Sequence, residues 1–215
     1  MADKSIQDFC ETILDACEAQ RMAWRVYKEK SDQLVGNSML SPSGRQQMQD
    51  ALDAEWAKQR AALVEDVKTA IDGIYEVERE TEIGFIIDPG VTEAVALLDR
   101  LGDTLPARSI QEIGTRFLGN QPALRTLARY AVERCEIPKE RVEAAFSGMV
   151  YDSDLINEMA DAVEGARTSG AVPQMVAAMD GGIIEQGAAT IAASFERPQW
   201  VGGRDGMRPR AAVMF

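Results

Sequence analysis

The sequence has no histidine and only three cysteines among its 215 residues. It therefore lacks the commonest general base and a major class of metal ligand, and no Cys-x-x-Cys pair replaces them. Cys10 and Cys17 would lie about 10 Å apart along a helix axis, too far for a disulfide bond within one helix. Cys135 stands alone in a later segment. Three unpaired thiols favour buried structural roles in a reducing compartment, and we expect no metal and no cofactor.

Long apolar runs and a basic surface are missing as well. No run approaches the roughly 20 apolar residues of a membrane span, and the start at Met1–Lys4 is not typical of a signal peptide. The net charge of −12 argues against broad nucleic-acid binding, since phosphate contacts need a concentrated basic face. The sequence predicts a protein that is cytoplasmic on synthesis, with neither a membrane nor a nucleic acid as its partner.

No arrangement typical of a catalytic site emerges either. Ser147-Gly148 lacks the strand-to-helix context of a nucleophile elbow, and no histidine is present to act as its base. Carboxylate pairs such as Asp152 and Asp154 are explained more simply as helix caps or solvated positions. Gly202–Gly206 has the composition of a phosphate loop, but it follows no strand and opens no helix. The sequence therefore predicts a protein that is not an enzyme and has no small-molecule substrate.

The residues that are present organise around Ser5–Glu82, which reads as two long helices folded back on each other. Large and apolar residues recur along both arms at steps of three and four residues, as they do on one face of a helix. In the first arm they are Ile6, Cys10, Ile13, Cys17, Gln20, Trp24, Tyr27, Ser31 and Leu34, and in the second Met48, Leu52, Trp56, Leu63, Val67, Ala70 and Ile74.

The register of the two arms follows from the position of the turn. Antiparallel arms joined near Leu40 pair residues whose numbers sum to about 80. Trp24 then meets Trp56, and Ile13 meets Val67. We expect these four side chains to pack an antiparallel helical hairpin of the coiled-coil type, the alternative being two amphipathic helices that pack elsewhere.

Helix start and stop signals mark the turn and the end of the hairpin. Gly36 is placed to end the first helix, and Ser43 with Gln46 matches a capping box that opens the second. Ile83–Ile87 is a short apolar run closed by Asp88-Pro89-Gly90. No second strand-like run exists to pair with it, so we interpret it as an extended connector.

The segment after the connector reads as a series of shorter helices separated by Gly and Pro. The expected helices are Val91–Leu101, Ser109–Leu118 with a capping box of Ser109 and Glu112, Pro122–Cys135, one that opens at Pro138, one from about residue 152 to 167, and Pro173–Phe195. Their apolar faces supply a small common core. Within the last of them, Gly181-Gly182 predicts a kink, a close approach of another backbone, or two helices joined by a loop.

The last twenty residues differ from the rest of the chain. Glu196–Phe215 is rich in Pro and Gly, which prevent regular structure, and it is locally basic in an acidic protein. It also carries more large apolar side chains than a disordered tail usually has. We expect an extended arm that docks on a neighbouring subunit or back on its own chain. Its predicted contact residues are Trp200, Arg204, Arg208, Arg210 and Phe215.

These patterns predict an all-α protein. A long N-terminal antiparallel hairpin is expected over residues 1–84, a small bundle of short helices over residues 85–195, and an extended C-terminal arm over residues 196–215.

One segment resembles a known group of proteins. Ser109–Ile113 (SIQEI) and Phe117–Leu127 (FLGNQPALRTL), which follow an N-terminal coiled-coil region, are similar to small helical proteins encoded in bacteriophage and prophage structural-gene clusters. The resemblance implies association with a virion or with head assembly. It implies no functional residues.

Two classes of function are compatible with the sequence. The first is a non-enzymatic structural or assembly protein of a phage-like particle, which forms a homo-oligomer or joins a larger protein shell through its tail. The alternative is a cytosolic helical adaptor or regulator that binds one protein partner along the hairpin. Sedimentation separates the two, because an assembly protein should form higher oligomers and an adaptor should stay a monomer or dimer.

Overall fold

The computed structural model describes residues 5–85, 89–169, 179, 181–196 and 198. Every regular element in these ranges is a helix, which confirms the predicted all-α class with two long helices followed by shorter ones. Within the same ranges, no helix combines the length and the apolar character needed to cross a bilayer. The chain divides into two compact units. The hairpin unit takes its described residues from 8–73 and 154–189, and the body unit takes its own from 5–7, 74–153 and 190–198.

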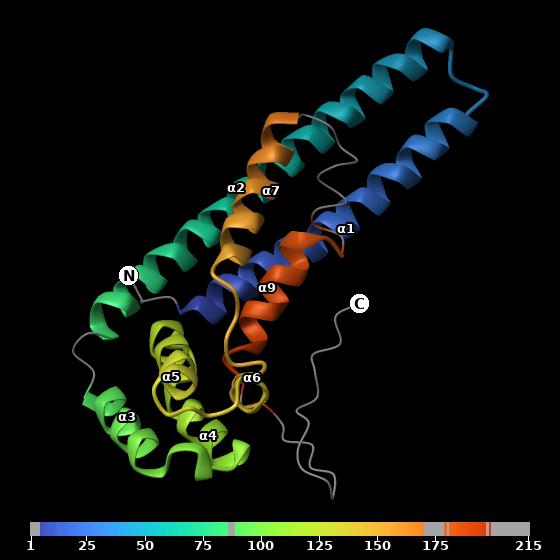
Figure 1. Cartoon of the computed structure of the whole chain (residues 1–215). Coiled ribbons are helices and arrows are strands. Elements are labelled where there is room, and N and C mark those ends of the chain that lie inside the picture. Colours follow the sequence, from blue (N-terminus) through green and yellow to red (C-terminus); the bar gives the residue numbers. More distant parts are fainter. Residues whose placement is uncertain (1–4, 86–88, 170–178, 180, 197, 199–215) are drawn as a thin grey trace, which may run out of the picture. The chain divides into compact units, whose positions relative to one another are not determined.

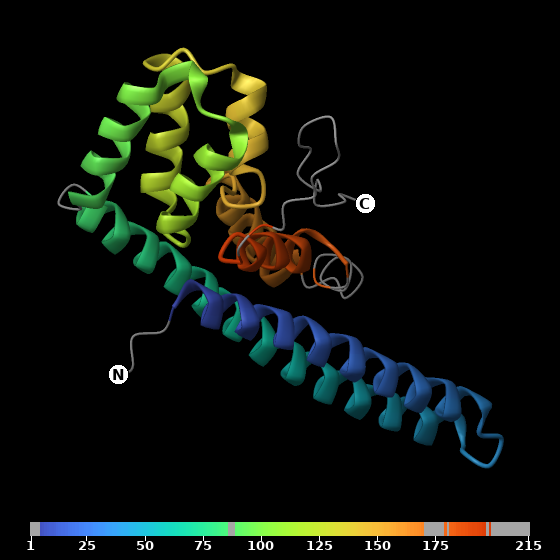
Figure 2. The same ribbon diagram turned by 90° about the horizontal axis from the view of Figure 1, so that it is seen from below.

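The hairpin consists of α1 (Ile6–Gly36) and α2 (Pro42–Phe85), which run side by side in opposite directions (Figures 1 and 2). Asn37 shapes the turn, since its side-chain oxygen accepts from the Met39 amide at 3.0 Å. The helix α2 starts earlier than the capping box at Ser43 predicts. Its cap is Ser41, whose Oγ accepts from the Gly44 amide at 3.1 Å. Pro42 then occupies the first helical position, where its missing N–H costs nothing.

The expected extended connector is wrong for its first three residues. Residues 83–85 continue α2, and residues 86–88 lie outside the described part of the chain. A lone apolar run has no partner strand for its backbone groups, whereas each residue added to an existing helix gains a hydrogen bond. The helix therefore continues to Phe85.

Two later helices, α7 (Asp154–Ser169) and α9 (Ile183–Ala193), complete the hairpin unit. Arg21 of α1 pairs with Glu185 of α9 at 2.8 Å. A Cβ added at Gly187 of α9 would meet Cγ of Met159 in α7 at 2.8 Å, so these two helices pack very closely. The Gly pair before α9 breaks the helix that the sequence predicts there, because α9 starts at residue 183 and Gly181 has φ +72°.

Burial along the hairpin is uneven. The base of the hairpin, near residues 10–20 and 56–71, is buried in the core of the hairpin unit, whereas the distal half towards the turn stays largely exposed. The buried core residues of this unit include Cys10, Ile13, Cys17, Trp56, Val64, Val67, Ile71, Ile156, Met159, Val163 and Ile184. In the distal half Val26 is 46% exposed and Met48 is 50% exposed. The distal half is thus a two-helix layer without a full core.

The body unit packs short helices around one apolar cluster. The helices are α3 (Pro89–Leu101), α4 (Ala107–Gly114), α5 (Gln121–Glu133) and α6 (Lys139–Phe146), with 3-10 turns η1 (Gly102–Thr104) and η2 (Thr115–Phe117) beside α4. Asn120 caps α5, because its side-chain oxygen accepts from the Ala123 amide at 3.1 Å. The expected capping box at Ser109 is wrong. The helix α4 begins at Ala107 behind Pro106, and Glu112 pairs with Arg108 instead.

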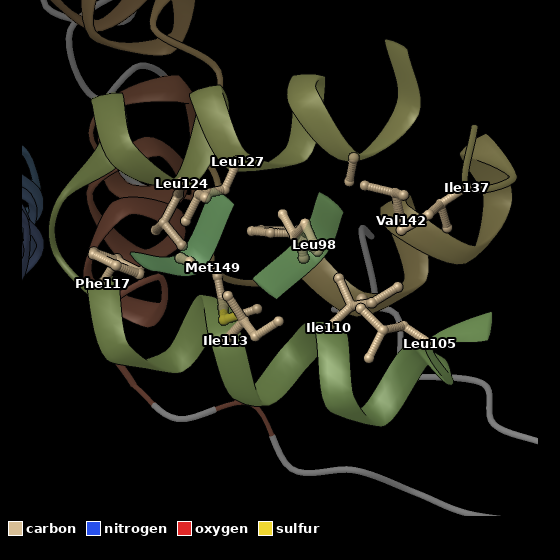
Figure 3. Packing of buried hydrophobic residues seen from close by; sticks show 14 of the residues in the cluster. Leu98, Leu105, Ile110, Ile113, Phe117, Leu124, Leu127, Ile137, Val142 and Met149 are labelled. Carbon is tan, nitrogen blue, oxygen red and sulfur yellow. The ribbon is translucent and has the colours of Figure 1, made fainter. Parts of the chain in front are cut away.

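Figure 3 shows the core of the body unit. Leu98, Ile110, Leu124 and Leu127 are fully buried, so each of the three helices α3, α4 and α5 contributes at least one large side chain. Met149, from the segment after α6, is also fully buried in the same cluster. Burial of one such side chain contributes about 1.5–3 kcal/mol. The amphipathic faces expected from the sequence therefore meet in one core.

The contacts do not divide the chain at residues 84 and 195. The end of α2 from Ile74 onwards belongs to the body unit, while α7 and most of α9 belong to the hairpin unit. The three expected domains remain a prediction about which segments fold independently. The expected tail contacts at Trp200, Arg204, Arg208, Arg210 and Phe215 lie outside the described residues.

Candidate interaction surfaces

Three aromatic rings join α1 to α2 at the upper end of the buried base. The Trp24 ring lies 5.4 Å from Tyr27 and 5.6 Å from Trp56, and the Tyr27 and Trp56 rings are 5.5 Å apart, centroid to centroid. Trp56 is 4% exposed, but Trp24 is only half-buried. The structure thus brings the two tryptophans together. It places Ile13 and Val67 deeper in the base, where both are fully buried.

Polar contacts continue the same pairing of the arms towards the turn. Tyr27 donates its hydroxyl hydrogen to Asp53 at 2.8 Å, and this bond is the main reason that the Tyr27 pKa is raised. The Gln49 amide donates to Asp53 at 2.8 Å, and Gln49 accepts from Ser31 at 3.2 Å. These bonds hold the distal half in register where apolar burial is slight.

A groove runs along one face of the distal half, between α1 and α2. We call it the hairpin groove. Its larger pocket has a volume of about 470 Å³, and a smaller one of about 30 Å³ continues it towards Trp56. The residues that line the larger pocket are Lys30, Gln33, Leu34, Asn37, Met48, Ala51, Leu52 and Glu55. Its floor is apolar, and Lys30 and Glu55 stand on opposite arms.

A second groove, the α5–α6 groove, lies in the body unit and has a volume of about 440 Å³. Its lining is apolar at the centre, with Ala128, Val132, Val142, Phe146 and Val150. Ion pairs border it on both helices. Arg129 pairs with Glu133 at 2.9 Å on α5, and Lys139 pairs with Glu143 at 3.4 Å on α6. An apolar strip between neutralised charges is suited to an apolar segment of protein.

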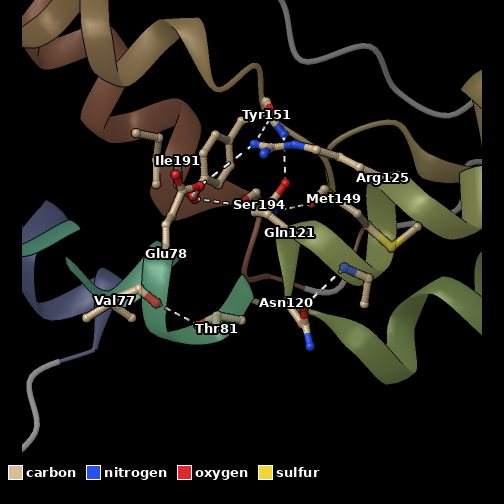
Figure 4. A network of polar contacts seen from close by, with 11 residues as sticks. Val77, Glu78, Thr81, Asn120, Gln121, Arg125, Met149, Tyr151, Ile191 and Ser194 are labelled. Atoms are coloured by element: carbon tan, nitrogen blue, oxygen red, sulfur yellow. Dashed lines mark hydrogen bonds and ion pairs between the residues drawn. The ribbon is translucent and has the colours of Figure 1, made fainter. Parts of the chain in front are cut away.

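The third feature is a polar network that ties the end of α2 to α5 and to the segment after α6 (Figure 4). Tyr151 donates to Glu78 Oε1 at 2.6 Å, and Arg125 Nη2 lies 3.7 Å from the same oxygen. Arg125 also donates to the Tyr151 carbonyl at 3.1 Å, and Gln121 donates to the Met149 carbonyl at 2.8 Å. A pocket of about 500 Å³ beside the network is lined by two carboxylates and two guanidinium groups.

This network is a structural clamp. The carboxylate of Glu78 accepts from Tyr151 and is paired with Arg125, so it joins three elements of the body unit. The sequence did not predict this network, because Glu78, Arg125 and Tyr151 belong to separate elements. Residues so far apart in sequence form no recognisable motif.

Cys10 and Cys17 are both fully buried in the core of the hairpin unit. Burial, with a smaller effect of Glu11, raises the pKa of the Cys10 thiol to about 12. Cys135 is half-buried, and burial followed by the charge of Asp99 raises its pKa too. In the described ranges, no group of three or more Cys, Asp or Glu side chains is arranged to hold a metal ion.

Two buried polar side chains at the base of the hairpin have atoms without partners. Gln20 is fully buried, and within the described part of the chain neither its amide nitrogen nor its amide oxygen has a hydrogen-bond partner. The same holds for the buried indole nitrogen of Trp56. Buried polar atoms without a partner lower stability.

Comparison with known proteins identifies no relative: no protein-family model matches the chain, and no match was found among curated proteins or solved structures.

Proposed function

We propose that this protein is a non-enzymatic structural or assembly component that acts through self-association and through docking of its C-terminal segment. The observation that carries the proposal is the α5–α6 groove, an apolar surface on the body unit. The proposed occupant of the groove is the segment that starts at residue 199.

The groove and the segment have matching chemistry. The half-buried side chains of Ala128, Val132 and Val150 form the accessible apolar surface, and each of α5 and α6 adds one ion pair at the border. The segment contains Trp200 and Phe215 as large apolar groups, together with several arginines. Large side chains that fill apolar pockets supply most of the affinity of such contacts, and charges mainly steer the approach.

The chain can reach the groove from its exit point. Phe195 packs on Gly119, since a Cβ at Gly119 would meet the Phe195 ring at 2.8 Å. Gly119 directly precedes Asn120, the cap of α5. Val132 follows Gly119 by roughly 20 Å along α5, at 1.5 Å per residue. An extended chain covers that distance in about six residues, so the segment from residue 199 onwards is long enough.

The setting of this assembly is proposed from the resemblance to phage and prophage structural proteins. On that proposal the protein is made in the cytoplasm and joins a virion or a head-assembly complex, with copies of itself or a protein shell as its partners. The adaptor alternative rests on the hairpin groove, which suits a single helical partner equally well.

Sedimentation of the full chain and of a chain truncated after residue 196 tests the proposal. We expect the full chain to form higher oligomers and the truncated chain to lose them while it keeps its helix content. A labelled peptide of residues 197–215 should bind the truncated chain, as measured by fluorescence anisotropy.

A groove variant and a matched control make this test specific. Val132→Glu should abolish peptide binding, because it places a charge on the apolar surface of the groove. Val95→Glu, at another half-buried valine on the core of the body unit, should retain it. Circular dichroism checks that both variants are folded. A truncated chain that assembles like the full chain, or a peptide that binds Val132→Glu normally, would overturn the proposal.

A further inference from the structure

The hairpin groove faces away from the helix that pairs with α1. Arg21, which bonds Glu185 of α9, precedes Lys30 by nine residues. At about 100° per residue these two side chains point to opposite sides of α1. Figures 1 and 2 show the distal ends of α1 and α2 continuing beyond α7 and α9. The groove is therefore on a face that neither helix covers.

This face carries more apolar surface than a solvated two-helix layer needs. Val26 and Met48 are about half exposed, at 46% and 50%. Leu34 and Leu52 line the floor from opposite arms and are only half-buried. Two helices alone bury little of such a stripe, and a further helical layer would cover it.

The charges of the groove are divided between the two arms. Both arms carry exposed charges of both signs, with Lys28, Glu29 and Asp32 on α1 and Asp50 and Lys58 on α2, but the charged residues that line the groove are Lys30 on α1 and Glu55 on α2. Lys30 and Glu55 both line the groove, and in the described part of the chain neither takes part in an ion pair. A surface of this kind is complementary to itself when α1 of one copy lies on α2 of another.

We infer that the hairpin groove is a self-association surface whose occupant is the hairpin of a second copy, with α1 of each copy laid against α2 of the other. This inference rests on the self-association in the proposed function and names its surface. A twofold axis along the hairpin produces the pairing twice, because every contact of an isologous dimer recurs. It brings Lys30 of each copy near Glu55 of the other. The opposite arrangement, α1 on α1, places Lys30 of one copy near Lys30 of the other and is disfavoured.

The size of the surface sets the strength of the contact. The groove lining extends over residues 23–37 in the first arm and 48–59 in the second, or roughly 21 Å and 17 Å along the two helix axes. A two-helix face about 20 Å wide then buries roughly 800 Å² over both copies, below the 1,200–2,000 Å² of stable interfaces. The dimer is accordingly weak and depends on concentration. In an assembly it is reinforced by other contacts of the same chains.

A charge-exchange experiment on the full chain tests the inference. Lys30→Glu and Glu55→Lys should each weaken self-association about tenfold, since both pairs of the dimer become repulsive. An equimolar mixture of the two variants should regain the wild-type affinity. The Lys30→Glu variant is acidic at both positions and the Glu55→Lys variant is basic at both, so each of the two contacts in the mixed dimer joins an acidic side chain to a basic one. The double variant should regain the affinity on its own. Sedimentation velocity over a range of concentrations measures the association of the two single variants, of their mixture and of the double variant.

The mixture separates a contact between copies from one within the hairpin, since an intramolecular pair cannot be restored by mixing. Lys28→Glu is the matched control on the same helix, because Lys28 does not line the groove, and it should leave association unchanged. Recovery only in the double variant, or self-association that none of the variants alters, would overturn the inference and leave the proposed function standing. A wild-type chain that stays monomeric at every concentration would overturn both.

Discussion

Tyr151 donates its phenolic hydrogen to Oε1 of Glu78 across 2.6 Å, and this bond fastens the segment after α6 to the end of α2. Arg125 strengthens the attachment from a third element, because its guanidinium lies 3.7 Å from the Glu78 carboxylate and 5.5 Å from the centre of the Tyr151 ring. Tyr151 is 3% exposed, so its hydroxyl has little access to water as a replacement partner. The body unit thus includes the end of α2 through polar contacts as well as apolar ones.

Tyr151→Phe is expected to lower the free energy of unfolding by about 1–2 kcal/mol, because it removes a hydrogen bond to a charged acceptor while keeping the ring. Urea unfolding followed by circular dichroism measures the loss. The same substitution in a Glu78→Ala background should cost much less, because the acceptor is already gone. Equal losses in both backgrounds would show that the hydroxyl does not depend on Glu78.

The pairing of Trp24 with Trp56 was readable from the sequence because both lie on one stripe and the turn fixes the register. The extent to which each of the two rings is buried could not be predicted from the sequence. Trp56 is buried and Trp24 only half-buried, since the rings sit where the covered base of the hairpin gives way to the distal half. That border depends on α7 and α9, which follow about a hundred residues later in the sequence and carry no signal that relates them to one part of the hairpin.

The sequence signals for the start of α2 gave the wrong capping residue because two candidate caps lie close together. Ser41 and Ser43 are both good capping residues, and Pro42 decides between them by its preference for the first position of a helix. The clamp at Glu78 depends on tertiary packing alone. The place of Gln20 on the apolar stripe of α1 was readable, but the lack of a hydrogen-bond partner for its amide among the described residues was not. Both grooves likewise arise from the positions of helices after folding, so the sequence predicts amphipathic faces without showing which of them remain uncovered.

Trp56→Ala should therefore be much more damaging than Trp24→Ala. We expect a loss of about 3–5 kcal/mol for the buried ring and roughly half of that for the half-buried one, measured by denaturant unfolding. The double variant should lose less than the sum, by about 1 kcal/mol, because the two rings contact each other. Additive losses would contradict the ring contact.

Gln20→Met should stabilise the hairpin unit. Gln20 is fully buried with both amide atoms unpaired among the described residues, and methionine has a similar length and shape without the polar atoms. Removing a buried polar group that has no partner gains about 1 kcal/mol, seen as a higher midpoint of urea unfolding. Gln47→Met, at an exposed position of α2, is the control and should change the midpoint little. A lower midpoint for Gln20→Met would indicate that the amide is hydrogen-bonded in solution.

Because of the ion pair between Arg21 and Glu185, the stability of the hairpin unit should depend on pH in the acidic range. Burial acts to raise the pKa of Glu185, but the Gly181 amide at 2.7 Å and the Arg21 guanidinium together outweigh it, and the pKa falls below its ordinary 4.5. A carboxyl group whose pKa is lower in the folded state than in the unfolded state adds stability above the unfolded pKa. That stability is lost as the pH falls through the folded pKa.

Glu185→Gln keeps the size of the side chain and removes the titrating group, so it is the variant that isolates this effect. The wild-type protein should be more stable than Glu185→Gln at pH 7, and the difference should shrink as the pH falls below about 4.5. Urea unfolding at a series of pH values measures both chains side by side. Glu112→Gln, which alters an exposed pair within α4, is the matched control and should show only a small difference at any pH. A difference for Glu185→Gln that stays constant from pH 7 to pH 3 would mean that the carboxylate of Glu185 contributes nothing through its charge.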